Sequence, residues 1–157
     1  MTVETIFKAL ADPTRLRIAR LLSTMELAVG ELAQVLGQSQ PRVSRHVGIL
    51  CDAGLAERRR EGSWVFLRST TGADTSSPIV EAVEQLLATA EQENADFAKQ
   101  CEDDRRKLAA IRTSRETSAE EYFAQHAGEW DELRARHSAD AHVEQSLLVI
   151  HAQFHKL

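Results

Sequence analysis

Residues 29–50 of the chain, VGELAQVLGQSQPRVSRHVGIL, decide its fold. Apolar residues at helical spacing predict one helix over Val29–Leu36, and Gly37 suits the left-handed backbone position at which helices commonly end. A second helix is predicted to begin at Ser39, because the serine hydroxyl can cap a helix N-terminus. Pro41 fits this prediction, since proline is tolerated in the first turn of a helix. Two short helices joined by so tight a turn are typical of a helix-turn-helix unit.

The second of these helices has two chemically different faces. Val43, Val47 and Leu50 fall on one side and are expected to face the core. The other side and the first turn hold polar side chains: Ser39, Gln40, Arg42, Ser44, Arg45 and His46. Arginine can form paired hydrogen bonds with guanine, and glutamine can do so with adenine. Serine can form a hydrogen bond with either base. Free amides at the helix N-terminus also attract phosphate. The face is therefore a candidate for reading base edges in double-stranded DNA.

The flanking segments complete a recognisable order of elements. Upstream, helical periodicity over residues 6–22 is interrupted at Asp12-Pro13, where an N-cap and a first-turn proline predict a new helix. Downstream, residues 55–68 form two extended runs around Glu61-Gly62, which predict a β-hairpin. This hairpin carries the cationic and turn residues of a second candidate DNA contact: Arg58, Arg59, Arg60 and Gly62.

The longest helical pattern follows the hairpin. Apolar residues recur at helical spacing over 78–113, and a helix of that length would extend roughly 50 Å. Because a domain of 1–77 cannot cover such a helix, a partner helix from a second copy is implied. Residues 112–117 are read as a polar linker, and a capping-box sequence at Ser118 predicts that further helices fill a C-terminal extension over 118–157.

The fold class predicted from these elements is mostly α with a small β-hairpin. Its architecture is a winged helix-turn-helix with a long C-terminal dimerisation helix and extra helices. The predicted domains are 1–77 for DNA binding, 78–113 for dimerisation and 118–157 for the helical extension.

Composition and charge fit a DNA-binding protein with an uneven charge distribution. The chain has 157 residues, 43% of them apolar, and no apolar run long enough to span a bilayer; its first residues lack the layout of a secretion signal. A cytoplasmic protein without a membrane partner is expected. The net charge of the whole chain is −5, but residues 1–72 carry a net positive charge, with ten Lys and Arg against seven Asp and Glu. Any polyanion is therefore expected to bind this first part, because the remainder is strongly acidic.

Several motifs in the first part resemble those of ArsR-type transcriptional repressors. They are ALADPTRLRI at 9–18, SQPRVSRH at 39–46, Ala53-Gly54-Leu55 and the RREGSW hairpin at 59–64. The similarity covers roughly residues 3–90. It implies a homodimer that binds an operator and blocks transcription, with the first and fifth helices forming the dimer contact.

The metal sites of that family are not matched here. ELAVGEL at 26–32 aligns with the family's metal box, but Ala28 and Gly30 occupy the two cysteine positions, and neither side chain can bind a soft metal. The histidines of the family's fifth-helix zinc site are also missing. Cys51 and Cys101 leave open a nonstandard thiolate site, although a small buried core residue is the simpler interpretation of Cys51. We therefore predict no metal and no cofactor, and the inducer stays unassigned.

Residues 118–150 are faintly similar to the helical entry segment of methyltransferases fused to some ArsR-type regulators. In those fusions a glycine-rich loop that holds S-adenosylmethionine follows. The seven glycines of this chain form no such cluster, so we expect no enzyme activity. Two alternatives stay open: a helical protein-interaction adaptor that uses the acidic helices, and a truncated regulator–methyltransferase fusion without its catalytic core.

Overall fold

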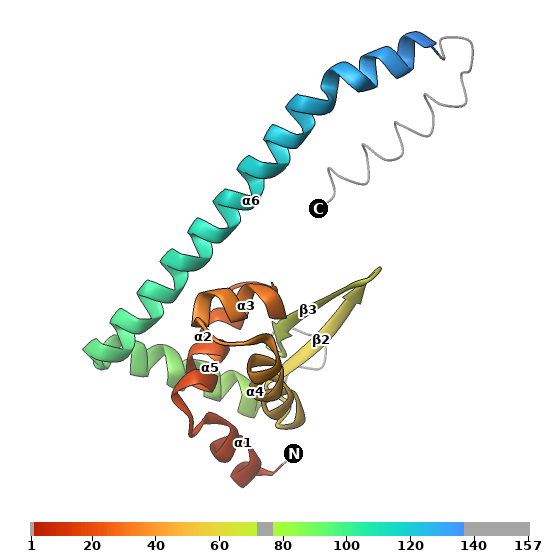
Figure 1. Cartoon of the computed structure of the whole chain (residues 1–157). Helices are drawn as coiled ribbons and strands as arrows, with labels where there is room; N and C mark the ends of the chain where they lie inside the picture. Colours follow the sequence, from red (N-terminus) through yellow and green to blue (C-terminus); the bar gives the residue numbers. More distant parts are fainter. Residues whose placement is uncertain (1, 72–76, 137–157) are drawn as a thin grey trace. The chain divides into compact units, whose positions relative to one another are not determined.

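The computed structural model describes residues 2–71 and 77–136, with side chains as far as residue 129. Contacts divide the chain into two units, Met1–Arg112 and Thr113–Leu157. Figure 1 shows the short helices of the first unit gathered together, with a β-hairpin projecting from them. The elements are α1 (Val3–Leu10), α2 (Pro13–Leu22), β1 (Leu27–Ala28), α3 (Val29–Leu36), α4 (Gln40–Asp52), β2 (Ala56–Glu61), β3 (Trp64–Ser69), α5 (Pro78–Glu93) and α6 (Ala95–Arg136).

The predicted helix-turn-helix unit is confirmed. α3 ends at Gly37, whose φ of +63° is the left-handed conformation that glycine adopts without strain. The amide of Gln38 donates to the carbonyl of Ala33 and closes the end of the helix. α4 then packs its apolar side, Val43, Val47 and Leu50, fully into the core. The sequence pattern therefore located both helices and the buried side of the second.

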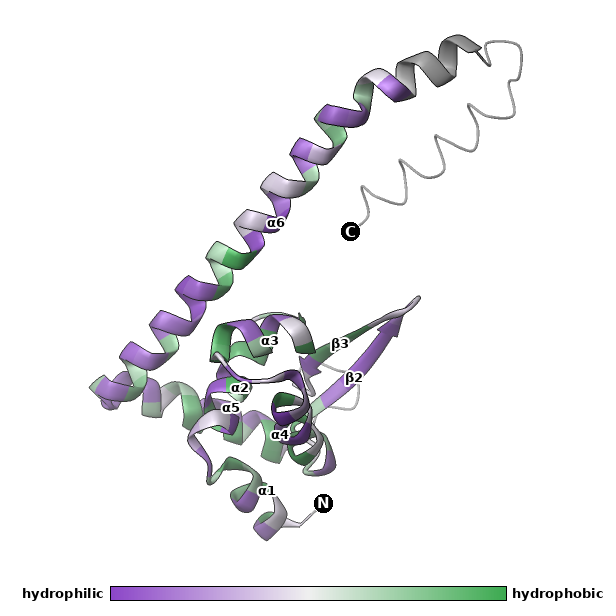
Figure 2. Ribbon diagram, viewed as in Figure 1, coloured by the Kyte–Doolittle hydropathy of each residue, from purple (hydrophilic) through white to green (hydrophobic). Residues whose placement is uncertain are grey.

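The predicted hairpin is also confirmed, as part of a three-stranded antiparallel sheet in the order β1-β3-β2. The hairpin stays paired out to Glu61 and Trp64, and Gly62 makes the turn with a φ of +61°. β1 was missed because two residues are too short for a visible alternation. It pairs Leu27 with the buried Leu67 and so joins the sheet to the start of α3. Figure 2 shows β2 as a hydrophilic strand.

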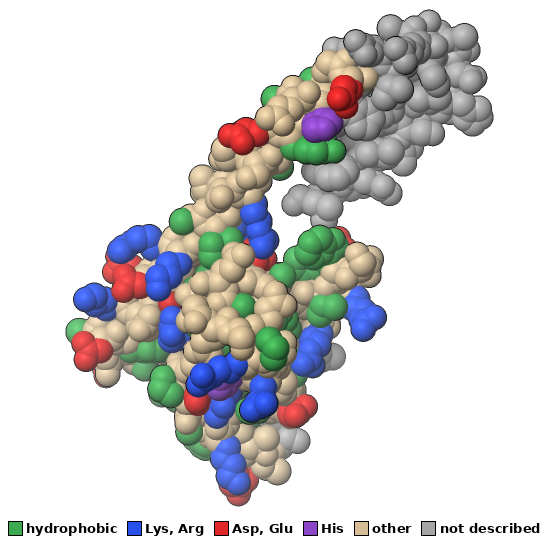
Figure 3. Space-filling model, viewed as in Figure 1, with side chains coloured by type: hydrophobic (Ala, Val, Ile, Leu, Met, Phe, Trp, Pro, Cys, Tyr) green, Lys and Arg blue, Asp and Glu red, His purple; other side chains and the backbone are tan. Residues whose placement is uncertain are grey.

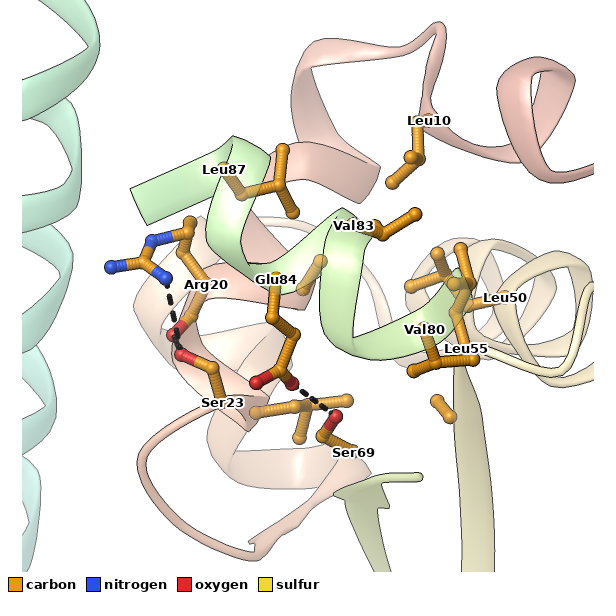
Figure 4. Close-up of a pocket in the computed structure, with 13 residues that line it drawn as sticks. Leu10, Arg20, Ser23, Leu50, Leu55, Ser69, Val80, Val83, Glu84 and Leu87 are labelled. Carbon is orange, nitrogen blue, oxygen red and sulfur yellow. Dashed lines mark hydrogen bonds between the residues drawn. The ribbon is translucent and has the colours of Figure 1, made fainter. Parts of the chain in front are cut away.

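The prediction of a single helix over 78–113 is wrong. The helix breaks at Asn94, which adopts an extended backbone with φ −109° and ψ 107°. Its side-chain oxygen accepts a hydrogen bond from the amide of Phe97 at 3.0 Å, so Asn94 ends α5 and caps α6. α5 itself packs on the core: Figure 4 shows Val80, Val83 and Leu87 directed toward the side where Leu10, Leu50 and Leu55 lie.

The linker predicted at 112–117 is also wrong, because α6 runs through it without interruption. These residues include neither glycine nor proline, and the Thr117 hydroxyl donates back to the carbonyl of Thr113 inside the helix. The capping-box sequence at Ser118 therefore starts no helix. The part of the predicted C-terminal extension after residue 136 lies outside the described residues.

The first turns of α6 are tied to α2 by buried ion pairs. The Arg17 guanidinium donates two hydrogen bonds, of 2.9 and 2.7 Å, to the carboxylate of Asp104, which is only 1% exposed. Nearby, Arg20 of α2 and Arg105 of α6 both bind the carboxylate of Glu91 on α5. Their hydrogen bonds and charges hold the pKa of Glu91 at about 2 against the opposing effect of burial.

Among the described helices, none is both long and apolar enough to cross a bilayer.

We predict that Asp104→Asn lowers the free energy of unfolding by about 3 kcal/mol, because it leaves the Arg17 guanidinium without its charge partner in a buried site. Asp103→Asn is the matched control, since the Asp103 side chain is 38% exposed and pairs only loosely with Arg106. That control is expected to change the free energy by less than about 0.5 kcal/mol. Urea unfolding measures both values, and equal effects would contradict the assignment of Arg17–Asp104 as a structural pair.

We also predict a pH dependence from Glu91. Its pKa is lower in the folded chain, about 2, than the ordinary value of 4.5, so the ionised form stabilises the fold above pH 4.5. The stability advantage of the wild type over Glu91→Gln should shrink as the pH falls from 4.5 toward 2. Unfolding curves at a series of pH values test this; an advantage that stays constant down to pH 2 would disprove it.

Candidate nucleic-acid interface

The outward face of α4 is the first part of the candidate interface. Ser39, Gln40, Arg42, Ser44 and Arg45 are all exposed, whereas Val43 between them is buried. Within the described part of the chain, no carboxylate forms an ion pair with Arg42 or Arg45. Ser39 occupies the predicted N-cap position, but its hydroxyl makes no capping hydrogen bond. α4 therefore presents two uncompensated guanidinium groups and several small hydrogen-bonding groups from a helix whose opposite side is buried.

His46, the sixth residue predicted on this face, is turned toward the body of the domain. Its Nδ1 atom lies 3.2 Å from Nη1 of Arg15 and 4.0 Å from a carboxylate oxygen of Asp12. Arg15 also donates to the carbonyls of Lys8 and Ala9 at the end of α1. His46 thus connects α4 to the junction of α1 and α2. Sequence spacing could not reveal this, because the partners lie about thirty residues away.

Asp12 completes this junction. Its carboxylate accepts a hydrogen bond from the amide of Arg15, as the sequence predicted for an N-cap. Burial raises the pKa of Asp12, but the amide hydrogen bond and the charge of Arg15 outweigh it and the pKa is lowered. The ionised Asp12 therefore helps to hold the Arg15 guanidinium beside His46.

The wing, defined here as residues 56–69, separates its three arginines by strand alternation. Arg58 and Arg60 are exposed on one face of β2. Arg59 points to the other face, where Nε and Nη2 donate to the Glu26 carboxylate at 3.0 and 2.6 Å. Arg59 also binds Glu61 and lies over the ring of Phe66. The charge of Arg59 is thus compensated within the chain.

Arg58 and Arg60 remain as the wing's available cations. Arg58 reaches toward α4, since a Cβ built at Gly48 would lie 3.9 Å from its Nη2 atom. Gly62 serves the turn through its positive φ rather than through lack of space, because no atom lies within 4 Å of a Cβ built there. In Figure 3, Lys and Arg side chains lie over α4 and along the wing. Two sets of cations therefore flank one surface.

Metal ligands are scarce around this surface. Across residues 2–71 and 77–129, no three or more His, Cys, Asp or Glu side chains lie together as a metal site would require. Cys51 is half-buried and Cys101 is buried. Burial raises the pKa of both thiols. A thiol must lose its proton to bind a soft metal, and burial makes that loss less favourable for both residues.

Comparison with known proteins supports an assignment to a family. Residues 12–58 match the family described as bacterial regulatory protein, arsR family. The chain is 50% identical over 64 residues to the arsenical resistance operon repressor of Escherichia coli (strain K12), a match that covers 40% of this chain and 55% of that protein. The chain thus spans little more than half of the length of this curated relative.

Other relatives are matched over more of their length. The biofilm growth-associated repressor of Agrobacterium fabrum is 34% identical over 90 residues, which cover 57% of this chain and 75% of that protein. A solved homodimeric winged helix-turn-helix DNA-binding domain from Mycobacterium bovis is 30% identical, with a TM-score of 0.49 over 59% of this chain and 80% of that one. The family match and the identity to the Agrobacterium fabrum repressor show that the chain belongs to the ArsR family of bacterial regulatory proteins.

Proposed function

We propose that this protein is a sequence-specific DNA-binding transcriptional repressor that acts in the cytoplasm as a homodimer, by binding rather than by catalysis. The observation that carries the proposal is the exposed face of α4, where Arg42 and Arg45 stand uncompensated on a helix with a fully buried opposite side. The family relatives are named as repressors, which supports this direction of regulation.

The two elements of the interface have different roles in DNA binding. α4 is the base-reading element, because a single helix fits the major groove and Gln40, Arg42 and Ser44 offer hydrogen bonds to base edges. The wing is the backbone-contacting element, with Arg58 and Arg60 attracting phosphates. Arg59 and His46 have structural partners inside the chain and act by holding the wing and α4 in place.

Homodimer formation rests on apolar residues left exposed on α1 and α5. Phe7 is 60% exposed and Leu86 is 54% exposed, and Val3 lies exposed one turn before Phe7. The apolar side chains in the part of α6 that belongs to the first unit do not provide this argument, since Cys101 and Leu108 are buried there. A second copy that covers the α1 and α5 residues would also present two α4 helices to successive turns of DNA.

We predict that Arg42→Ala and Arg60→Ala weaken DNA binding in different ways. The test duplex is one that the wild-type chain enriches from a random pool, and a scrambled duplex is its counterpart. Arg42→Ala should lose preference for the enriched duplex, by roughly 1–3 kcal/mol per contacted base pair, and keep its affinity for the scrambled one. Arg60→Ala should weaken both and reduce the log–log salt slope by up to about two units in a dimer.

Titrations at several salt concentrations measure these effects, with Arg106→Ala as the control. The Arg106 side chain is 70% exposed on α6. Its substitution removes the same charge at a position away from the interface. Full preference retained by Arg42→Ala, or an unchanged salt slope in Arg60→Ala, would show that the two elements are wrongly assigned. Failure of the wild type to enrich any duplex would overturn the proposed function itself.

We predict that Phe7→Asp combined with Leu86→Asp converts the dimer to a monomer, because burying two carboxylates in an apolar contact is unfavourable. Tyr122→Asp is the control, since Tyr122 is 56% exposed but lies on the later part of α6. Sedimentation at micromolar concentration should show a dimer for the wild type and the control. A monomeric wild type, or dissociation caused only by Tyr122→Asp, would refute this interface.

A further inference from the structure

Residues 26–31, which include β1 and the first turn of α3, contact three other parts of the first unit. Glu26 provides the wing contact: its carboxylate binds Arg59 of β2 and lies 3.9 Å from Arg68 of β3. The hydrogen bond and charge of Arg59 lower the pKa of Glu26, so this carboxylate is ionised at neutral pH. The base of the wing is therefore fixed to residue 26.

The same segment lies against the start of α4. A Cβ built at Gly30 would lie 3.2 Å from Nε2 of Gln40, the first residue of the helix. Gln40 is also one of the residues assigned to the base-reading face. A displacement of residues 26–31 would therefore reach both the wing and the first turn of α4.

The third contact comes from Arg112 of α6. Its Nη2 atom donates to the carbonyl oxygen of Glu26 at 3.0 Å, and its Nε atom lies 3.5 Å from the Glu31 carboxylate. Glu31 is buried, and its carboxylate also accepts a hydrogen bond from the amide of Ala28, the N-cap residue of α3. One guanidinium thus binds both ends of the segment, and Leu108 and Ile111 pack the same stretch of α6 against the core.

We propose that Arg112 is a positioning residue for DNA binding, which acts by fixing residues 26–31 and through them the wing and the start of α4. This inference rests on the proposed function. Arg112 does so because one planar guanidinium group can donate a hydrogen bond to the Glu26 carbonyl and at the same time form an ion pair with the Glu31 carboxylate. Without it, the buried carboxylate of Glu31 loses a cation, and the segment shifts toward solvent.

The DNA arm of the test uses the full chain and the enriched duplex defined above. Arg112→Ala should lower affinity for that duplex about tenfold, as expected for loss of hydrogen bonds to charged groups, with the salt slope unchanged. Arg112→Lys should give an intermediate loss, because an ammonium cannot reproduce the fork. Arg106→Ala removes an equal charge from the same helix and should change nothing. A salt slope reduced by one unit or more would make Arg112 a direct phosphate contact and overturn the proposal.

Amide hydrogen exchange gives a second readout that needs no DNA. In Arg112→Ala, exchange should become faster in residues 26–31 and in 57–61 of the wing, while the buried middle of α4 keeps its protection. Uniformly faster exchange would indicate general destabilisation and overturn a positioning role, as would unchanged exchange in the wing. If the wild type enriched no duplex, the proposed function would fail, and the exchange pattern would still decide whether Arg112 positions the wing.

Discussion

The burial of Val43, Val47 and Leu50 on one side of α4 is the constraint on which the rest of the structure depends. Each such side chain contributes about 1.5–3 kcal/mol when removed from water, so the helix has one stable orientation in the domain. That orientation directs Gln40, Arg42 and Ser44 outward together. Base reading needs this order, because hydrogen bonds to base edges discriminate only when their donors are already held in place.

Ion pairs add a second level of organisation around this core. Arg17–Asp104 and the Arg20–Glu91–Arg105 group hold α5 and the first turns of α6 against α2. These contacts explain why the chain after Asn94 returns to the domain rather than extending α5. They also bring Arg112 to residues 26–31, where the ArsR family has a metal box and this chain has Ala28 and Gly30.

The predictable parts of the fold were those governed by local chemistry. Gly37 marked the end of α3, and alternation around Gly62 located the hairpin, because backbone conformation and strand period are visible within a few residues. The roles of Arg59 and His46 could not be predicted in this way. Glu26 and Arg15, their partners, lie about thirty residues away, so only tertiary packing shows which of the polar side chains are already engaged.

The most direct test of the central claim is the amide NMR spectrum of the labelled protein, recorded with and without a duplex that it selects. If α4 and the wing form the interface, the largest shifts will fall at residues 39–46 and 58–64, with little change in α6 beyond Arg112. Shifts confined to the second unit, with α4 and the wing unaffected, would contradict the account.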